Sequence, residues 1–74
     1  MSFARLERGM KARVTAIESN PETLRLQEMG LTVGTEFEVA KIAPFGDTIE
    51  IRLRGYSLCL RKREADGIEL ELVA

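Results

Sequence analysis

Two glycines, four residues apart, constrain this chain more than any other feature. A helical run from Arg25 to Met29 is followed by Gly30, and Gly34 stands just before an alternating segment that begins at Thr35. Glycine enters the left-handed region of φ without strain, so it commonly ends helices and occupies tight turns. The pattern therefore predicts a helix that stops at Gly30 and a strand that begins shortly after it.

The start of this helix is also marked in the sequence. Residues 19–22 (Ser-Asn-Pro-Glu) supply a capping side chain, a first-turn proline and a carboxylate near the positive end of the helix dipole. We expect the helix to span about residues 21–29. On such a helix Leu26, Met29 and the following Leu31 would cover one open end of a sheet.

Apolar and polar residues alternate through most of the remaining chain, as they do in half-buried strands. Residues 10–18 form a less regular strand candidate. The side chains expected to face inward are Ala12, Val14, Ala16, Phe37, Val39, Ile49, Ile51, Leu53, Tyr56, Leu58, Leu60, Ile68, Leu70 and Leu72.

The hairpin turns can be checked against these faces, because inward residues must lie opposite inward residues. A two-residue turn at residues 54–55 pairs Leu53 with Tyr56 and Ile51 with Leu58, so apolar side chains meet throughout. The second hairpin therefore has a self-consistent register.

The first hairpin requires a different loop. A three-residue loop at residues 44–46, with Gly46 in the left-handed position, pairs Val39 with Ile51. Residues 41–42 then fall out of phase with the alternation. This mismatch predicts a bulge near the end of the strand.

These elements predict an all-β protein, a small five-stranded antiparallel barrel with one short inserted helix at about residues 21–29. A chain of 74 residues has room for a single domain, residues 1–74, that buries about 60% of its unfolded surface. A short turn at residues 62–65 would link the last two strands.

Composition limits the partners and the compartment. Eleven basic and twelve acidic residues, with no histidine, give a net charge of −1, which provides no general attraction for nucleic acid. A single cysteine cannot form an internal disulfide and fits a reducing compartment. The sequence contains no apolar run approaching the ~20 residues that span a bilayer. We expect a cytoplasmic protein without direct membrane insertion.

The sequence offers little to a catalyst. Without histidine, no Ser-His or Cys-His pair can be assembled, and the phosphate-binding motif G-x-x-x-x-G-K-[ST] is missing. Cys59, expected opposite Glu50 in a hairpin, is interpreted as a small packing residue rather than a nucleophile or ligand. We therefore expect no enzymatic activity.

The ligands for a transition metal are equally sparse. The chain has one cysteine and no histidine, the residues on which such sites usually draw. Glu69 and Glu71 would lie about 7 Å apart on one strand and are interpreted as solubilising residues. We expect no metal site and no tightly bound cofactor, which leaves only weak or transient binding of a transition metal.

Several spaced features stand out together in this chain: Leu26, Glu28-Met29-Gly30-Leu31, Gly34, Pro44-Phe45-Gly46-Asp47, Gly55, Leu58-x-Leu60-Arg61 and Glu64-Ala65. With this set, residues 9–72 resemble the family of ferrous iron transport protein A (FeoA). The resemblance implies an SH3-like module of bacterial ferrous iron uptake that contacts the cytoplasmic region of an FeoB-type membrane iron transporter and GTPase. Transition metal ion binding is associated with the family as a whole.

Two other functions share this fold class. An RNA-binding SH3-like module is suggested by the basic residues Arg52, Arg54 and 61–63, although the net charge is near zero and only Phe45 is expected to be free for base stacking. The second alternative is the SH3-like module of a metal-dependent repressor. The initiating methionine and the lack of a helix-turn-helix favour a separate accessory protein instead.

The expected partner-binding residues are Phe45, Arg52, Arg54, Thr32 and Val33. They combine an exposed loop, an arginine face and the corner between helix and strand. An arginine supplied to the GTPase of the partner is a further role for this face, but exposed strand arginines are usually only solvated. The sequence determines neither the oligomeric state nor whether the protein activates or restrains transport.

Overall fold

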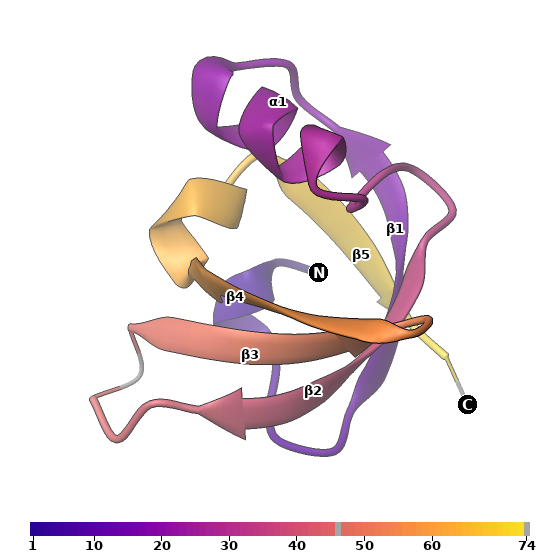
Figure 1. The fold of residues 1–74 in the computed structure, drawn as a ribbon. Coiled ribbons are helices and arrows are strands. Elements are labelled where there is room, and N and C mark those ends of the chain that lie inside the picture. Colours follow the sequence, from indigo (N-terminus) through magenta and orange to yellow (C-terminus); the bar gives the residue numbers. More distant parts are fainter. Residues whose placement is uncertain (46, 74) are drawn as a thin grey trace.

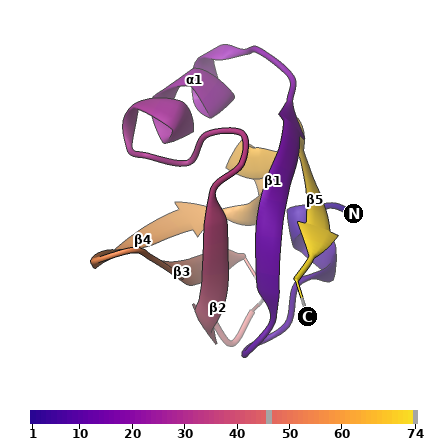
Figure 2. The ribbon, with the colours of Figure 1, turned by 90° about the vertical axis from the view of Figure 1, so that its right-hand side faces the viewer.

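The computed structural model describes residues 1–45 and 47–73 and shows one sharply bent antiparallel sheet (Figure 1). Its strands lie in the order β4-β3-β2-β1-β5, and β3 and β4 run across the direction of β1 and β5 (Figure 2). In chain order the elements are η1 (Phe3–Arg5), β1 (Lys11–Ile17), α1 (Pro21–Glu28), β2 (Glu36–Ile42), β3 (Thr48–Leu53), β4 (Tyr56–Arg61), η2 (Lys62–Ala65) and β5 (Ile68–Leu72).

The predicted fold class is confirmed: five strands surround one core, and α1 lies over one end of the bent sheet (Figures 1 and 2). The helix ends at Glu28, one residue earlier than expected. The predicted turn at residues 62–65 is the short 3₁₀ helix η2. None of the helices in the described residues has the length and apolar character of a membrane-spanning segment.

The start of α1 depends on two reciprocal hydrogen bonds. Asn20 Oδ1 accepts from the backbone N–H of Thr23 at 2.9 Å, and Thr23 Oγ1 accepts from the N–H of Asn20 at 3.0 Å. The Thr23 hydroxyl also donates to the carbonyl of Glu18 at 2.6 Å, and its side chain is buried. The predicted cap is confirmed, and Thr23 additionally ties the helix to the end of β1.

The core follows the predicted alternation at most positions. Phe37 and Val39 on β2 and all three apolar residues of β3 are buried. Phe3 was not expected in the core, but its ring stacks on that of Phe37 with centroids 5.4 Å apart. The buried hydrophobic residues are Phe3, Leu6, Ala12, Val14, Leu26, Leu31, Phe37, Val39, Ile49, Ile51, Leu53, Leu58, Leu60, Ala65, Ile68 and Leu70.

The alternation fails first at Ala16, which is exposed although it was expected to face inward. The pairing of β1 with β5 shifts between Val14 and Ala16, so β1 contains one extra residue. Such a bulge moves the following side chains to the opposite face. Ile17, which is partly buried, takes the inward side instead.

Three further apolar side chains predicted to face inward or to cover the core are partly exposed. Tyr56 is 45% exposed at the start of β4, Leu72 is 54% exposed at the end of β5, and Met29 is 39% exposed after α1. Each lies at the end of its element, where the layer that would cover it has already ended. Alternation indicates which side of a strand is apolar, but not how far the opposing layer extends.

The hairpin registers agree with the sequence. Leu53 lies opposite Tyr56 and Ile51 opposite Leu58, while Val39 lies opposite Ile51. The β2–β3 register then shifts between Val39 and Lys41, which confirms the predicted bulge.

The bulge also lengthens the β2–β3 loop. The N–H of Ala43 donates to the carbonyl of Thr48 at 2.8 Å, so four residues rather than three lie between these two. The left-handed conformation predicted for Gly46 lies outside the described residues.

The proposed register makes Leu53 a core residue, and Leu72 a matched surface control. Leu53 is 6% exposed and Leu72 is 54% exposed. Leu53→Ala should lower the free energy of unfolding by roughly 2–5 kcal/mol, because it leaves a cavity. Leu72→Ala should lower it by less than about 1 kcal/mol. Denaturant unfolding measures both, and equal losses would contradict the register.

Candidate functional site

The C-terminus of α1 forms a rigid corner. The N–H of Gly30 donates to the carbonyl of Gln27 and the N–H of Leu31 to that of Leu26, both at 3.0 Å. Gly30 has a φ of 108°, as predicted. These bonds form a Schellman motif, and the accompanying apolar contact involves the buried residues Leu26 and Leu31. The end of the helix is therefore fixed to the core.

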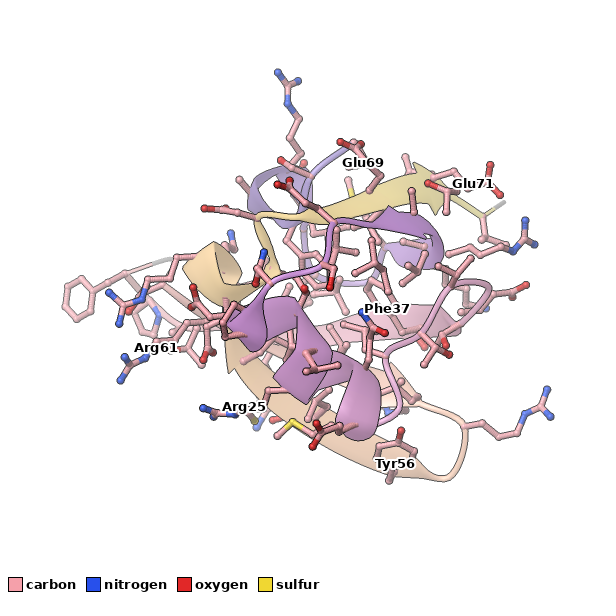
Figure 3. All side chains as sticks on the ribbon, turned by 90° about the horizontal axis from the view of Figure 1, so that it is seen from above. Arg25, Phe37, Tyr56, Arg61, Glu69 and Glu71 are labelled. Carbon is pink, nitrogen blue, oxygen red and sulfur yellow. The ribbon has the colours of Figure 1, made fainter. Side chains whose placement is uncertain are left out.

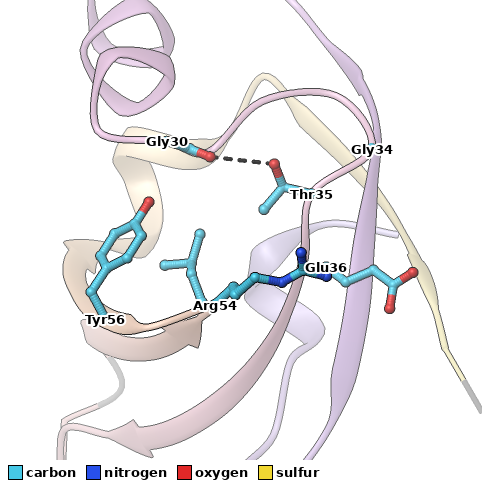
Figure 4. A pocket seen from close by; sticks show the side chains of 7 residues that line it. Gly30, Gly34, Thr35, Glu36, Arg54 and Tyr56 are labelled. Carbon is cyan, nitrogen blue, oxygen red and sulfur yellow. Dashed lines mark hydrogen bonds between the residues drawn. The ribbon is translucent and has the colours of Figure 1, made fainter.

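The loop after this corner is held on both sides. Thr35 Oγ1 donates to the carbonyl of Gly30 at 3.3 Å (Figure 4) and accepts from the N–H of Thr32 at 3.1 Å. The N–H of Gly34 donates to the carbonyl of Val14 at 2.8 Å, and the φ of Gly34 is 91°. The loop is thus bonded to α1 at one end and to β1 at the other.

Tyr56, the first residue of β4, closes the corner opposite the loop. Its hydroxyl donates to the carbonyl of Met29 at 2.8 Å. A Cβ atom on Gly30 would collide with this hydroxyl, so Gly30 is needed for close approach as well as for its φ. The first residue of β4 is thereby hydrogen-bonded to the end of α1.

An open pocket of about 360 Å³ lies between the loop and the β3–β4 turn (Figure 4). We call it the corner pocket; it is lined by Gly30, Gly34, Thr35, Glu36, Leu53, Arg54 and Tyr56. It offers one guanidinium, one carboxylate, two hydroxyl-bearing side chains and an apolar floor. This set suits recognition of a mixed polar and apolar surface.

The carboxylate of the corner pocket belongs to a larger charged group. Arg13 on β1 lies between Glu36 Oε2, at 2.9 Å from its Nη2, and Glu71 Oε1, at 2.6 Å from its Nη1. Hydrogen bonding to Glu36 first, and then to Glu71, raises the pKa of Arg13 above its usual value. All three side chains are solvent-accessible, so their net effect on stability is small.

The structure brings some predicted site residues together. Thr32 and Val33 belong to the loop that forms one wall of the corner pocket, and Arg54 lines the opposite wall. Val33 is 61% exposed, so an apolar side chain is available beside the pocket. Tyr56 also lines this pocket, which sequence reasoning missed, although its position beside the two-residue turn at residues 54–55 was a signal.

Phe45 lies elsewhere, whereas Arg52 lines a neighbouring open pocket together with Arg54 and Glu36. Phe45 is 97% exposed in the β2–β3 loop, at the opposite end of β3 from Arg54. Six strand residues separate these ends by about 20 Å. Arg52 Nη1 lies 3.8 Å from Glu38 Oε1 on the neighbouring strand. Phe45 is therefore separate from the rest of the predicted partner surface, while Arg52 adjoins it.

The candidate ligands do not converge on a metal. Cys59 lies opposite Glu50, as expected, but it is exposed, so its interpretation as a packing residue was wrong. Glu69 lies near the N-terminal amino group and Glu71 binds Arg13. Within residues 1–45 and 47–73, no three His, Cys, Asp or Glu side chains are grouped to hold a metal ion.

Comparison with known proteins finds a family whose model matches nearly the whole chain. The model of the FeoA domain family matches residues 1–72. The Fe(2+) transport protein A/Fe(2+) transporter FeoB fusion protein of Porphyromonas gingivalis is 31% identical over 75 residues, which cover all of this chain. The chain spans only 9% of the length of that fusion protein.

Solved structures agree with the fold. The NMR structure of an FeoA-like protein from Clostridium acetobutylicum has a TM-score of 0.89 and 37% identity, over 100% of this chain and 87% of that one. FeoA of Stenotrophomonas maltophilia, an SH3 domain protein crystallised with zinc, has a TM-score of 0.79 and 21% identity. That likeness covers 96% of this chain and 89% of that one. At this identity the second likeness shows the SH3-like fold alone.

The corner can be tested by placing a side chain at each glycine. Gly34→Ala meets no atom within 4 Å, so it should cost only the strain of a left-handed alanine, about 1–2 kcal/mol. Gly30→Ala should cost more, since its Cβ also collides with Tyr56.

The loss of stability that Gly30→Ala shows beyond that of Gly34→Ala should depend on the hydroxyl of Tyr56. In a double-mutant cycle, Gly30→Ala should destabilise the Tyr56→Phe variant less than it destabilises the wild-type chain. Chemical denaturation gives the four free energies of unfolding. Additive losses would contradict the close approach of Tyr56 to Gly30.

The sparse ligand set predicts weak metal binding by the isolated chain. Calorimetric titration with ferrous and zinc ions should reveal no stoichiometric site with a dissociation constant below about 1 μM. Cys59→Ser provides the comparison, because Cys59 supplies the chain's only thiol. A single tight site that disappears in Cys59→Ser would overturn this expectation.

Proposed function

Because this chain belongs to the FeoA family, we propose that it is a cytoplasmic accessory protein of ferrous iron uptake that acts by contact with an FeoB-type transporter. The observation that carries the proposal is the P. gingivalis fusion protein, in which ferrous iron transport protein A and the transporter FeoB form one chain. Fusion keeps two modules at high effective concentration, as suits partners that work together. Contact with the cytoplasmic region of the transporter would give a separate chain the same proximity.

The corner pocket is the proposed contact site. Its loop is held by backbone bonds to α1 and β1, so docking a partner there would require little ordering of the backbone. Val33 offers exposed apolar surface, Arg54 a charge and Thr32 a hydroxyl on the same loop as Val33. Arg52, beside the corner pocket, and Phe45, beyond the far end of β3, stay predictions of further contact points.

No chemical step is assigned to the chain itself. Its sequence contains no histidine and no phosphate-binding loop, and the Sγ atom of its single cysteine lies 4.0 Å from Glu50 Oε1. GTP hydrolysis and iron translocation would then belong to the transporter. The accessory role consists of binding, which is what a small SH3-like barrel with a rigid corner is suited to do.

RNA binding fits the surface less well. Arg52, one of the basic residues that suggested it, is near Glu38, and the exposed ring of Phe45 lies at the other end of β3 from Arg54. Base stacking beside a basic groove needs both on one surface. The basic residues at 61–63 remain, and their role is considered below.

Docking can be measured with the tagged chain and the cytoplasmic region of its FeoB-type transporter. Val33→Asp and Arg54→Ala should each weaken binding at least about tenfold, because each removes a contact at the centre of the site. Leu72→Asp is the matched control, since Leu72 is similarly exposed on β5. Biolayer interferometry gives the affinities after thermal unfolding confirms that each variant is folded.

Two outcomes would decide against this proposal. Failure of the wild-type chain to bind the transporter would reject the function. Loss of binding in Phe45→Ala, with Val33→Asp and Arg54→Ala unchanged, would reject the corner and assign docking to the β2–β3 loop.

A further inference from the structure

The two edge strands of the sheet differ in their backbone hydrogen bonding. At the β5 edge, the Met1 amino group donates to the carbonyl of Leu70 at 2.8 Å, and the N–H of Leu70 donates to the carbonyl of Met1 at 2.9 Å. The N-terminal residue thus occupies this edge as a short additional strand would. The opposite edge of the sheet is β4.

The pairing pattern shows which groups of β4 point away from the sheet. In an antiparallel pair, every second residue exchanges both backbone bonds with its partner. The two-residue turn makes Leu53 and Tyr56 such a hydrogen-bonded pair. Six residues after Tyr56, the N–H of Lys62 also donates across the hairpin, to the carbonyl of Asp47 at 3.0 Å. The alternate residues of β4 therefore direct their N–H and C=O groups outward.

These alternate residues are Ser57, Cys59 and Arg61. The N–H of Arg61 already donates to Glu64 Oε1 at 2.9 Å. For Ser57 and Cys59, no backbone partner on the outer side of β4 occurs among the described residues, and both are exposed. Two donors and two acceptors thus stand at the spacing that an added strand would match.

Charge surrounds this free edge. Arg54 precedes β4, and residues 61–63 end it with three consecutive basic side chains. Arg25 approaches from α1, on the same side of the molecule as Arg61, whereas Glu69 and Glu71 lie on β5 at a distant edge (Figure 3).

A second open pocket lies between Arg25 and Arg61. It measures about 360 Å³ and is lined by Arg25, Thr48, Cys59, Leu60, Arg61 and Glu64. The carboxylates beside the edge are Glu50, 4.0 Å from Cys59 Sγ, and Glu64, 4.0 Å from Arg25. At the end of the edge near the second pocket, the four basic side chains of Arg25 and residues 61–63 outnumber these two carboxylates, so this end favours an anion.

We propose that the free edge of β4 binds an extended acidic peptide segment as a sixth strand of the sheet. The backbone groups of Ser57 and Cys59 pair with the segment, and Arg25 and Arg61 receive a carboxylate at the end of β4. Strand addition of this kind takes its affinity from backbone bonds and its selectivity from side chains. The inference concerns a different surface from the corner pocket and does not require docking there.

The surroundings favour this occupant over two others. Two copies of the chain paired through β4 would bring like charges together from both basic ends, which disfavours self-association. Single-stranded nucleic acid would match the charge but not the alternating donors and acceptors of a strand edge. Both occupants are retained as outcomes of the test.

The probe is an acetylated and amidated octapeptide of alternating glutamate and valine. Titrated into the ¹⁵N-labelled full chain, it should shift the amide signals of Ser57 and Cys59 saturably. A lysine–valine peptide of the same length is the charge control. The backbone control is a glutamate–valine peptide with N-methyl groups on alternate residues, along the edge that faces β4. The lysine–valine peptide and the N-methylated peptide should each bind at least about tenfold more weakly than the unmodified glutamate–valine peptide.

Variants of the chain separate backbone pairing from charge. Cys59→Pro removes one outward N–H without removing a bond to β3, and edge strands tolerate such a proline. Arg25→Gln/Arg61→Gln removes the two guanidinium groups at the end of β4. Each change should weaken the glutamate–valine peptide about tenfold. The matched control Arg8→Gln/Lys11→Gln, on exposed side chains before and at the start of β1, should bind as the wild-type chain does.

The inference is overturned if no saturable shift occurs at about 1 mM glutamate–valine peptide, near the weakest affinity that would count as specific. It is also overturned if the N-methylated peptide binds equally well, a result that does not depend on whether Cys59→Pro folds. Tight, salt-sensitive binding of an oligouridine at the same amides would assign the edge to nucleic acid. A concentration-dependent dimer that shifts these amides without peptide would assign it to a second copy.

Discussion

The fold depends on a single glycine position at which backbone conformation and close approach coincide. Gly30 ends α1 with a left-handed φ, and the space left by its missing side chain holds the hydroxyl of Tyr56. The left-handed residue sends Leu31 into the core, while the hydroxyl bonds the end of α1 to β4. A larger residue would disturb both connections, because the same Cβ would strain the backbone and displace the tyrosine.

This arrangement explains how so small a chain presents a defined surface. The helix is fixed at its start by Asn20 and Thr23 and at its end by the Schellman motif. The loop that follows is bonded to β1 through Gly34 and Val14. Binding residues on a loop held at both ends lose little conformational entropy when a partner docks, which suits a protein whose proposed role consists of contact.

Strand β4 contributes to two distinct surfaces. Its first residue, Tyr56, lines the corner pocket, while the backbone of Ser57 and Cys59 forms the free edge. The surface ion pairs, such as Arg13 with Glu36 and Glu71, are exposed and contribute little stability individually. The core and the backbone bonds maintain the shape, so most surface charges are available for recognition.

The site could be predicted only in part. Thr32, Val33 and Arg54 were expected at a partner surface; Arg54 lines the corner pocket, and Thr32 and Val33 lie in the loop between two other lining residues, Gly30 and Gly34. Phe45 was grouped with them because its loop is exposed, yet the length of β3 separates it from Arg54. Tyr56 was assigned to the core because alternation gives the side of a strand but not the extent of the layer above it.

The sequence by itself determined the features that depend on neighbouring residues. These are the capped start of α1, its end at Gly30, the register of both hairpins and the bulge in β2. Each follows from the φ preferences of glycine and proline, from a local side-chain bond or from a two-residue period, and none requires knowledge of distant segments.

Only the tertiary structure decided the features that depend on how segments distant in sequence meet. The bulge opposite β5 turned Ala16 outward, and stacking on Phe37 placed Phe3 in the core. The order of the strands left β4 at an edge while the N-terminal residue covered β5. Burial and edge exposure depend on how the strands and helices assemble, so the residue pattern within a single strand does not determine them.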